Sequence, residues 1–259
     1  MNPPVLLNLN VILLSLASLR LPEGTCPKNF KDAGDDVCFL NFVKGAGFCD
    51  THQICEEEGI KHGLRLFVPG IHVGKMMQTF PAQQCTYTGF SGLLNRSTGD
   101  LRAGWNVGDP GYSKFATDLG DKTIPWGMGE PNSLVQAVTV VMAGRLTDDV
   151  ELHYTSSNVV CELSLRSSVG NVEPFRQNWP YKLDSLHMLP GRSTSCFDTT
   201  IVASLFHCAM KCKLRKVCRA FYYTKETNEC WLALYVDSLL PFYTSIYPKT
   251  WMRFGRPEW

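Results

Sequence analysis

The chain lacks the charge imbalance that marks most nucleic-acid-binding proteins. Its 25 Lys and Arg residues nearly equal its 24 Asp and Glu residues, giving a net charge of +1, and such a balance argues against a whole-chain nucleic-acid binder. Low-complexity runs are also missing, and no stretch beyond residue 19 is long and apolar enough to cross a bilayer. With 44% hydrophobic and 19% charged residues over 259 positions, the chain is expected to form one large or two modest globular domains.

Catalytic signatures are missing as well. No H-E-x-x-H pair, Gly-x-Ser-x-Gly elbow or phosphate-cradling glycine loop occurs. The six histidines are scattered, at positions 52, 62, 72, 153, 187 and 207. Adjacent acids stand at 35–36 and 148–149, and such residues are usually solvated. The sequence therefore predicts a protein without enzymatic activity.

A short apolar run opens the chain. Residues 5–19 are interrupted by Asn8 and Asn10, so the run is too short for a good spanning helix. A Ser-Leu-Ala triplet at 15–17 places small residues at the spacing that a signal peptidase prefers. We therefore predict a cleaved signal peptide, residues 1–17, and a secreted, extracellular product, with a retained signal anchor as the alternative.

Eleven cysteines in a secreted chain predict disulfides rather than reduced thiols. They fall into two groups, from Cys26 to Cys161 and from Cys196 to Cys230. The interval between the groups contains three prolines and little periodicity, and we interpret residues 167–189 as a linker. Two disulfide-bonded domains are therefore expected.

The first group lies in a region that predicts mixed α and β structure. Cys26-Pro-x-x-Phe and residues 37–42 have the pattern of short strands, and a bridge from Cys26 to Cys38 would close them into a hairpin. Residues 49–59 have helical spacing, with Gly59 as the C-terminal stop. Further strands are predicted at 87–94, 135–142 and 157–163.

These landmarks occur in an order that resembles a long-form C-type lectin-like domain. They are the paired N-terminal cysteines, the helix that carries Cys55, Gly92-Leu93, the Trp-x-x-Gly-Glu-Pro-Asn loop that begins at Trp126, and the closing Val-Val-Cys161-Glu. The resemblance covers about 24–166 and implies a disulfide-stabilised α+β fold. It also implies a Cys55–Cys161 bridge between the helix and the last strand, worth about 4 kcal/mol on the entropic model.

The most informative stretch of this domain is Glu130-Pro131-Asn132. Because an X-Pro bond reaches the cis form more easily than other peptide bonds, the turn can hold the Glu130 and Asn132 side chains on one side. Their polar atoms suit calcium or sugar hydroxyls, although an ordinary surface turn can have the same sequence. The resemblance implies a sugar site of the mannose, glucose or fucose type at Glu130 and Asn132, with Asp148 and Asp149 as further calcium ligands.

The sequence departs from the family pattern near this site. Where the family has a Glu-Asp-Cys run, the chain has Gln136-Ala137-Val138, and no cysteine between Cys85 and Cys161 could complete the usual second bridge. The neutral Gln136 removes a charged ligand, and calcium affinity falls with the charge of the ligands. Two outcomes remain open: a working calcium and sugar site, or a preserved turn in a lectin-like fold that binds no calcium.

Three cysteines, Cys49, Cys85 and Cys196, have no pairing that a family resemblance implies. Cys49 and Cys85 are paired with each other by elimination. Cys196 then has no evident partner, and an odd cysteine in a secreted protein indicates an intermolecular bridge or a free thiol. The first option would give a disulfide-linked homodimer, and a nonstandard internal pairing is a third option.

A glycosylation signal lies in the loop after the Gly-Leu strand. Asn95-Arg96-Ser97 is an acceptor sequence for N-glycosylation. We therefore predict a glycan on Asn95 and a solvent-facing loop, with an unmodified loop asparagine as the alternative.

The second group of cysteines follows another pattern. Residues 200–211 place apolar residues and cysteines at helical spacing, and Cys208-x3-Cys212-x5-Cys218 leads into Arg-Ala-Phe. A helix attached by two bridges to a small sheet resembles a PAN/apple domain. The resemblance implies that Cys208 pairs with Cys230 and that Cys212 pairs with Cys218.

Positive charge concentrates around the middle cysteines of this region. The residues are Lys211, Lys213, Arg215, Lys216 and Arg219. Such a run can bind sulfated glycans or an acidic partner, and it can equally be the solvated face of a helix. The aromatic tail at 239–259 is expected to supply the closing strands.

Together these features predict a secreted recognition protein with a lectin-like domain at 24–166 and a PAN/apple domain at 190–259. Its expected partners are glycans or glycoproteins, bound with calcium as cofactor through Glu130 and Asn132. The alternative is a calcium-independent protein-interaction or adhesion protein that binds through the PAN/apple domain. Neither nucleic-acid binding nor a membrane span is expected.

Overall fold

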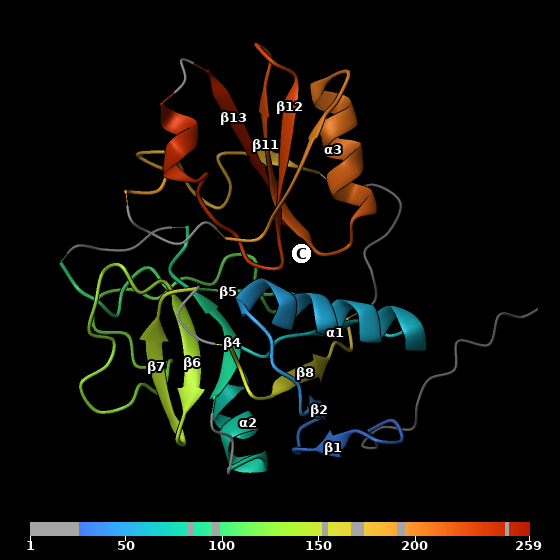
Figure 1. Cartoon of the computed structure of the whole chain (residues 1–259), viewed down its shortest axis with the longest axis vertical. Coiled ribbons are helices and arrows are strands. Elements are labelled where there is room, and N and C mark those ends of the chain that lie inside the picture. The colour runs from blue at the N-terminus through green and yellow to red at the C-terminus, as the bar shows by residue number, and fades with distance from the viewer. Residues whose placement is uncertain are drawn as a thin grey trace, which may run out of the picture.

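The computed structural model describes residues 26–81, 85–94, 99–151, 155–166, 174–190, 195–246 and 249–259. The predicted signal peptide and the sequon at Asn95 lie outside these residues. Within them, helices combine with three antiparallel sheets, two in the N-terminal half and one in the C-terminal half (Figure 1). The predicted α+β class is confirmed. No helix in this part of the chain is long and apolar enough to span a membrane.

In the N-terminal half (residues 26–166), one sheet brings together strands from both ends of the region. Its order is β1-β2-β8-β3, with bounds Lys31–Asp32, Cys38–Phe42, Val159–Leu163 and Leu66–Phe67. Helix α1 (Phe48–His62) packs against β3 and β8. A disulfide between Cys55 and Cys161 joins the helix to β8, so the beginning and the end of this half are held together.

The second sheet of this half carries the loops around the candidate site. Its order is β5-β4-β6-β7, with bounds Asn106–Val107, Cys85–Ser91, Val138–Met142 and Arg145–Asp149. Helix α2 (Val73–Thr79) contributes Met76 to an apolar cluster that includes Trp105 and Leu146. Leu146 packs in this cluster, and Asp148 lies two residues further along β7 on the same face, where it bonds the loop that precedes β6.

Helix α1 is longer than predicted. It continues past Gly59 to His62, and Gly63 ends it in the left-handed conformation, with φ of 65°. Gly59 has another function, because a Cβ atom there would lie 2.9 Å from the carbonyl oxygen of Leu64. The missing side chain lets the chain fold back closely against the helix. Glycine is also common at helix ends, so the same residue was predicted as the stop.

The C-terminal half (residues 174–259) forms a five-stranded sheet. Its order is β10-β12-β11-β13-β9, with bounds Phe197–Ile201, Glu229–Leu234, Cys218–Thr224, Trp251–Gly255 and Arg176–Gln177. Helix α3 (Leu205–Leu214) begins where Ser204 Oγ accepts a hydrogen bond from the backbone of His207. It starts later than the predicted position 200 because Thr200 and Ile201 belong to β10. A 3-10 helix, η1 (Phe242–Ser245), precedes β13.

The described part of the predicted linker packs on the C-terminal sheet. Its strand β9 pairs with β13. The Phe175 ring meets Phe221 edge-on, with centroids 5.2 Å apart, and Met188 donates a backbone hydrogen bond to Leu240. Residues 174–190 are therefore built into the sheet rather than suspended between the halves.

The two halves share an apolar core. One cluster of buried side chains contains Phe48 and Tyr87 from the first half and Leu232 and Val236 from the second. The backbone of Leu239 also donates a hydrogen bond to Leu93 across the boundary. Burial of this common core packs the two halves against each other.

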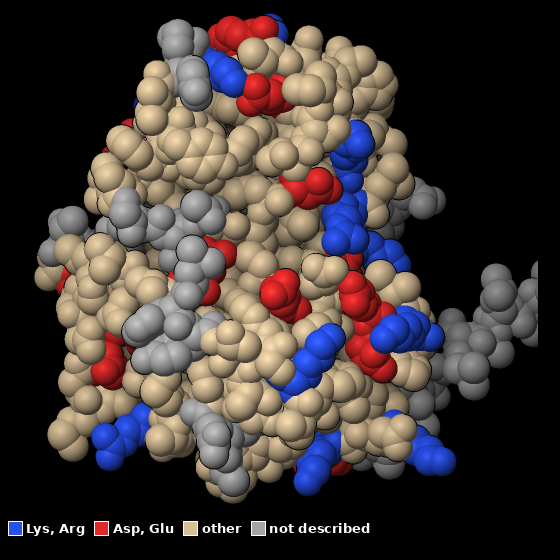
Figure 2. Space-filling model, viewed as in Figure 1, with Lys and Arg blue, Asp and Glu red and all other residues tan. Residues whose placement is uncertain are grey.

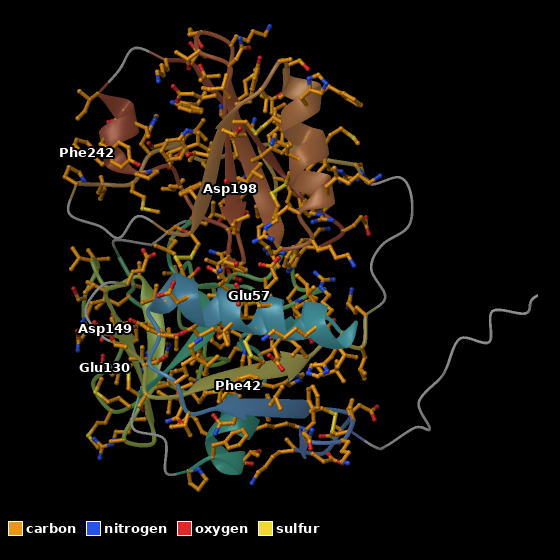
Figure 3. All side chains as sticks on the ribbon, turned by 45° about the vertical axis from the view of Figure 1, so that its right-hand side comes forward. Phe42, Glu57, Glu130, Asp149, Asp198 and Phe242 are labelled. Atoms are coloured by element: carbon orange, nitrogen blue, oxygen red, sulfur yellow. A yellow bond between two sulfur atoms is a disulfide. The ribbon has the colours of Figure 1, made fainter. Side chains whose placement is uncertain are left out.

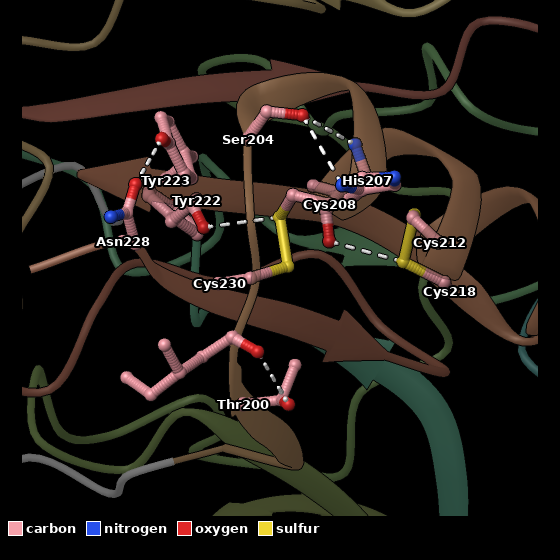
Figure 4. Close-up of a disulfide and its surroundings, with 12 residues drawn as sticks. Thr200, Ser204, His207, Cys208, Cys212, Cys218, Tyr222, Tyr223, Asn228 and Cys230 are labelled. Carbon is pink, nitrogen blue, oxygen red and sulfur yellow. Dashed lines mark hydrogen bonds between the residues drawn. A yellow bond between two sulfur atoms is a disulfide. The ribbon is translucent and has the colours of Figure 1, made fainter. Parts of the chain in front are cut away.

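Five disulfides are present, namely Cys26–Cys38, Cys49–Cys196, Cys55–Cys161, Cys208–Cys230 and Cys212–Cys218. The last two attach α3 to its sheet (Figure 4). The predicted Cys49–Cys85 pair is wrong, and Cys196 is neither free nor available for a homodimer. Cys49 lies in the first turn of α1, at the boundary between the halves, so its partner comes from the distant C-terminal half. Cys85 is the free cysteine of the described residues, and burial raises the pKa of its thiol.

Candidate functional site

The loop that carries the Glu-Pro-Asn turn is anchored at its base. The Trp126 ring packs on Trp105, with centroids 4.8 Å apart, and the Gly127 backbone donates a 2.8 Å hydrogen bond to Leu146 in β7. Glu130 then donates its backbone hydrogen bond to Gly127, and its peptide bond to Pro131 is cis. The turn is thus positioned by aromatic packing below it and by β7 beside it.

Asp148 of β7 connects the turn to the sheet. Its two carboxylate oxygens accept hydrogen bonds from the backbones of Asn132 and Ser133, at 3.0 and 3.3 Å. The Asn132 side chain donates to Glu130 Oε1 at 3.1 Å. The structure therefore brings Glu130, Asn132 and Asp148 together, through a strand residue that stands sixteen positions beyond the turn.

Glu130 and Asp148 place two carboxyl groups next to each other. Partial burial and the adjacent Asp148 carboxyl raise the pKa of Glu130 to about 7, while the hydrogen bond from Asn132 acts in the opposite direction. Glu130 Oε2 is buried and has no hydrogen-bond partner among the described residues. Two neighbouring carboxyl groups cannot both ionise easily without a compensating charge. Near neutral pH this pair is therefore poised to hold either a proton or a cation.

Asp149 does not join this carboxyl pair. Successive side chains of a strand point to opposite faces, and Asp149 Oδ1 accepts a 2.7 Å hydrogen bond from the backbone of Val150. Its charge still contributes to the raised pKa of Glu130, behind burial and Asp148. Figure 3 labels Glu130 and Asp149 in the same part of the N-terminal half. Asp149, predicted as a calcium ligand, therefore lies near the Glu130–Asp148 pair as a charge and not as a member of it.

Among the described residues, no group of three acidic, histidine or cysteine side chains meets at the turn. In the part of the chain that the structure describes, one such trio has its donor atoms within 4.8 Å of one another, and it consists of Cys49, Glu151 and Cys196. Two of its members form a disulfide, which removes their thiolates as metal ligands. A cation at Glu130 and Asp148 would therefore need amide, backbone or ligand oxygens in addition.

The predicted basic run does not form one surface. Arg215 makes a 2.7 Å ion pair with Glu56 of α1, and Arg219 is 5% exposed beneath the Trp259 ring. The run is therefore divided among a helix face, a contact between the halves and the interior. The spacing of the basic residues could not predict this division, because α3 ends at Leu214 and Arg215 and Arg219 lie beyond the helix.

Sequence reasoning also missed a group of buried acids near α2. Asp109 accepts backbone hydrogen bonds from Gly70 and Ile71, at 3.3 and 2.9 Å, and burial raises the pKa of its carboxyl to about 8. Glu162 of β8 contacts His72 at 2.7 Å. Asp109 stands in no recognisable motif. Glu162 belongs to the closing Val-Val-Cys161-Glu landmark, but that pattern gave no sign of its contact with His72.

Comparison with known proteins gives separate findings for the two halves. Residues 190–243 match the family model of the PAN domain. A search of curated proteins found no match. Solved structures similar to the N-terminal part of the chain are C-type lectin-like domains.

Three of the similar structures illustrate the sequence identity, the coverage and the TM-score of these matches. The C-type lectin CEL-I from Cucumaria echinata is 14% identical and covers 54% of this chain and 99% of its own, with a TM-score of 0.39. The human scavenger receptor C-type lectin carbohydrate-recognition domain is 17% identical and covers 53% and 98%, with a TM-score of 0.37. Herring type II antifreeze protein is 15% identical and covers 54% and 100%, with a TM-score of 0.39.

The disulfides and the comparisons support coarse statements about the compartment and the fold of the chain. Five disulfides are typical of proteins that fold in an oxidising, extracellular compartment. Residues 190–243 match the PAN domain model, and the N-terminal part of the chain is similar in fold to C-type lectin-like domains.

Proposed function

We propose that the protein is a secreted recognition protein that binds glycans in a calcium-dependent way through the turn at Glu130, Pro131 and Asn132. The observation that carries this proposal is the pair of adjacent carboxyl groups, Glu130 and Asp148, beside the Asn132 amide. Such a pair binds a cation more readily than an isolated carboxylate does, because the cation relieves the repulsion between the two charges.

The donor atoms at this site are oxygens of carboxylates and an amide, which are the ligands that calcium prefers. Glu130, Asn132 and Asp148 would hold the ion, and the ion would bind a pair of sugar hydroxyls. Asp148 already accepts two backbone hydrogen bonds, so it positions the turn as well as contributing charge. Because Gln136 is neutral, the affinity for calcium is expected to be lower than that of a site with a third carboxylate.

The turn also has suitable groups for sugar hydroxyls. An ionised Glu130 accepts hydrogen bonds and the Asn132 amide both accepts and donates, so the pair suits a mannose, glucose or fucose type of diol. A shallow site of this kind buries little surface and binds weakly. Strong binding would need several copies on a clustered ligand, and Cys196 cannot link those copies because it is bonded to Cys49.

Retention on mannose-agarose with and without EDTA tests the proposal. The wild-type chain is expected to be retained in calcium and released by EDTA. Combining Glu130→Gln with Asn132→Asp should abolish retention, while Glu57→Gln on the exposed face of α1 serves as the matched control. Retention that ignores both EDTA and the double substitution would rule out this mechanism.

A second candidate function rests on helix α3. Phe206, Met210 and Leu214 stand at i, i+4 and i+8, and they are 70%, 38% and 75% exposed. An exposed apolar stripe on a helix is a feature of protein-interaction surfaces. This favours a calcium-independent protein-interaction or adhesion role for the C-terminal half.

Binding to extracellular proteins distinguishes the two candidate functions. Adhesion through α3 predicts binding that persists in EDTA and is lost in the double variant Phe206→Ser with Leu214→Ser. Phe242→Ser, which changes an exposed aromatic residue on η1 in the same half, is the control. Binding that survives the α3 substitutions would exclude this surface.

A further inference from the structure

A cavity of about 590 Å³ lies where the two halves meet. One wall comes from α1 and from the ends of β3 and β8, and the other comes from the end of α3, Tyr235 and Trp259. Cavities that bind small molecules commonly enclose about 300 to 1,000 Å³. The size is therefore suitable for a ligand, and the position is distinct from the turn at Glu130.

Both walls of the cavity are held in place by contacts between the halves. The His52 ring of α1 stacks on Tyr235, with centroids 5.1 Å apart. Glu56 bonds both Arg215 and the Tyr235 hydroxyl, at 2.7 and 2.9 Å. The Cys49–Cys196 disulfide connects the start of the same helix to the C-terminal half. Because these contacts hold both walls in position, binding would require little reorganisation.

The lining of the cavity combines an apolar interior with a basic rim. Leu64, Leu163 and Val217 are among the apolar side chains. Arg166 and Lys216 are exposed at the edge, and neither has an acidic partner within the described residues. Figure 2 shows basic and acidic side chains close together along the right-hand side, near the level where the halves meet.

Charge at the cavity is unbalanced. Its lining contains one acidic residue, Glu56, and this residue is already paired with Arg215. The Arg65 guanidinium lies over the Trp259 ring at 4.7 Å. With Arg166 and Lys216 added, the lining has a net positive charge, which attracts anions to the opening.

A buried polar atom also lacks a partner in the lining. His52 is 4% exposed, and its Nε2 atom has no hydrogen-bond partner among the described residues. Burial lowers the pKa of His52 to about 3, so the imidazole is neutral at physiological pH. A buried, unsatisfied nitrogen costs free energy that a ligand or water can recover.

We propose that this cavity binds a small organic anion with an apolar body, such as a carboxylate or sulfonate attached to an alkyl chain or an aromatic ring. The apolar body occupies the space between Leu64 and Val217, and the charged group stays at the rim near Arg166 and Lys216. The apolar body offers no hydrogen bond to His52 Nε2, so a water molecule retained beside the ligand satisfies that nitrogen. Neither an uncharged lipid nor a small hydrophilic anion would match both features.

Calorimetric titration of the full chain in EDTA tests this proposal, because EDTA keeps a calcium site at Glu130 empty. Decanoate and naphthalene-2-sulfonate are expected to bind saturably with one molecule per chain. Acetate tests charge alone and decanamide tests the apolar body alone, and both are expected to bind at least about tenfold more weakly. The absence of saturable binding by both amphipathic anions, or equal affinity for decanoate and decanamide, would overturn the proposal.

Substitutions at the rim locate the binding. The double variant Arg166→Glu with Lys216→Glu is expected to weaken decanoate at least about tenfold and leave decanamide unchanged, since two exposed attractions become repulsions. Lys122→Glu, an exposed lysine outside the lining, is the control. Thermal unfolding confirms that the rim variant is folded. Decanoate affinity that is the same in the folded rim variant as in wild type would exclude this cavity.

Discussion

The two halves of the molecule treat buried charge differently. In the C-terminal half, Arg253 is 1% exposed and bonds both Asp237 and the carbonyl oxygen of Trp179. In the N-terminal half, the Asp109 carboxyl is buried with no cationic side chain hydrogen-bonded to it, and Glu130 adjoins another acid. Matched charges stabilise a structure, whereas unmatched carboxylates take up protons or cations. The comparison indicates that Arg253 and Asp237 form a structural ion pair, whereas Glu130 and Asp109 can take up a proton or a cation.

The halves also differ in how disulfides attach a helix to a sheet. The two cysteines of the Cys55–Cys161 bridge are separated by 106 positions in the sequence, whereas those of the α3 bridges are separated by 22 and 6. A larger loop loses more conformational freedom in the unfolded chain. The N-terminal half therefore depends more on one distant covalent contact, and the C-terminal half is held by local ones.

Removing the long bridge is expected to have the largest effect. The double variant Cys55→Ala with Cys161→Ala should lower the free energy of unfolding by about 4 to 5 kcal/mol, against about 2 kcal/mol for Cys212→Ala with Cys218→Ala, on the entropic model. Urea unfolding followed by circular dichroism measures both. If both double variants lost the same free energy of unfolding, the size of the loop closed by a disulfide would not explain a difference in stability between the halves.

Breaking the buried ion pair should come next. Asp237→Asn leaves Arg253 buried without its anion and is expected to cost about 3 to 5 kcal/mol of unfolding free energy. Urea unfolding at pH 7 gives the value, and Asp198→Asn on the outer strand β10 is the matched control. A loss as small as that of the control would show that the C-terminal half does not need this charge match.

The corresponding change in the N-terminal half should have the opposite sign. The pKa of Asp109 is raised to about 8 in the folded chain, from 3.8, so its stabilising contribution is complete below pH 3.8 and is lost as pH rises through 8. Asp109→Asn stays neutral. Its stability relative to wild type should therefore increase between pH 5 and 8, by at most about 1.4 kcal/mol per pH unit.

Unfolding curves of the Asp109→Asn variant and of wild type at pH 5, 6.5 and 8 measure this trend. A difference between the two proteins that stays constant over the range would show that Asp109 is ionised in the folded chain. It would also remove one of the unmatched acids on which the comparison of the halves rests.

Calcium binding at the turn should show the smallest effect. Because the pKa of Glu130 is raised to about 7, protons compete with the cation below that pH. Calcium affinity should therefore fall about tenfold from pH 8 to pH 6. Titration calorimetry measures it, and Glu130→Gln should bind more weakly and lose the pH dependence. Affinity that rises on acidification would contradict the carboxyl pair.

Features that depend on neighbouring residues could be predicted from the sequence. Individual helices and strands followed from sequence periodicity. The disulfide-stabilised α+β fold, the bridges of α3 and the Cys55–Cys161 bridge were implied by the family resemblances. The end of α1 was misplaced because Gly59 and Gly63 are both acceptable stops. Packing against Leu64 distinguishes them, and that contact depends on the path of the chain after the helix.

What the sequence determined by itself was local: the helical and strand periods, the cysteine pairs close in the chain, and the turn that presents Glu130 and Asn132. Tertiary structure alone decided which residues meet across distance, including Cys49 with Cys196, Glu130 with Asp148, and the walls of the cavity between the halves. The physical reason is that periodicity and turn chemistry act over a few residues, whereas burial and charge repulsion depend on the partners that folding brings into contact.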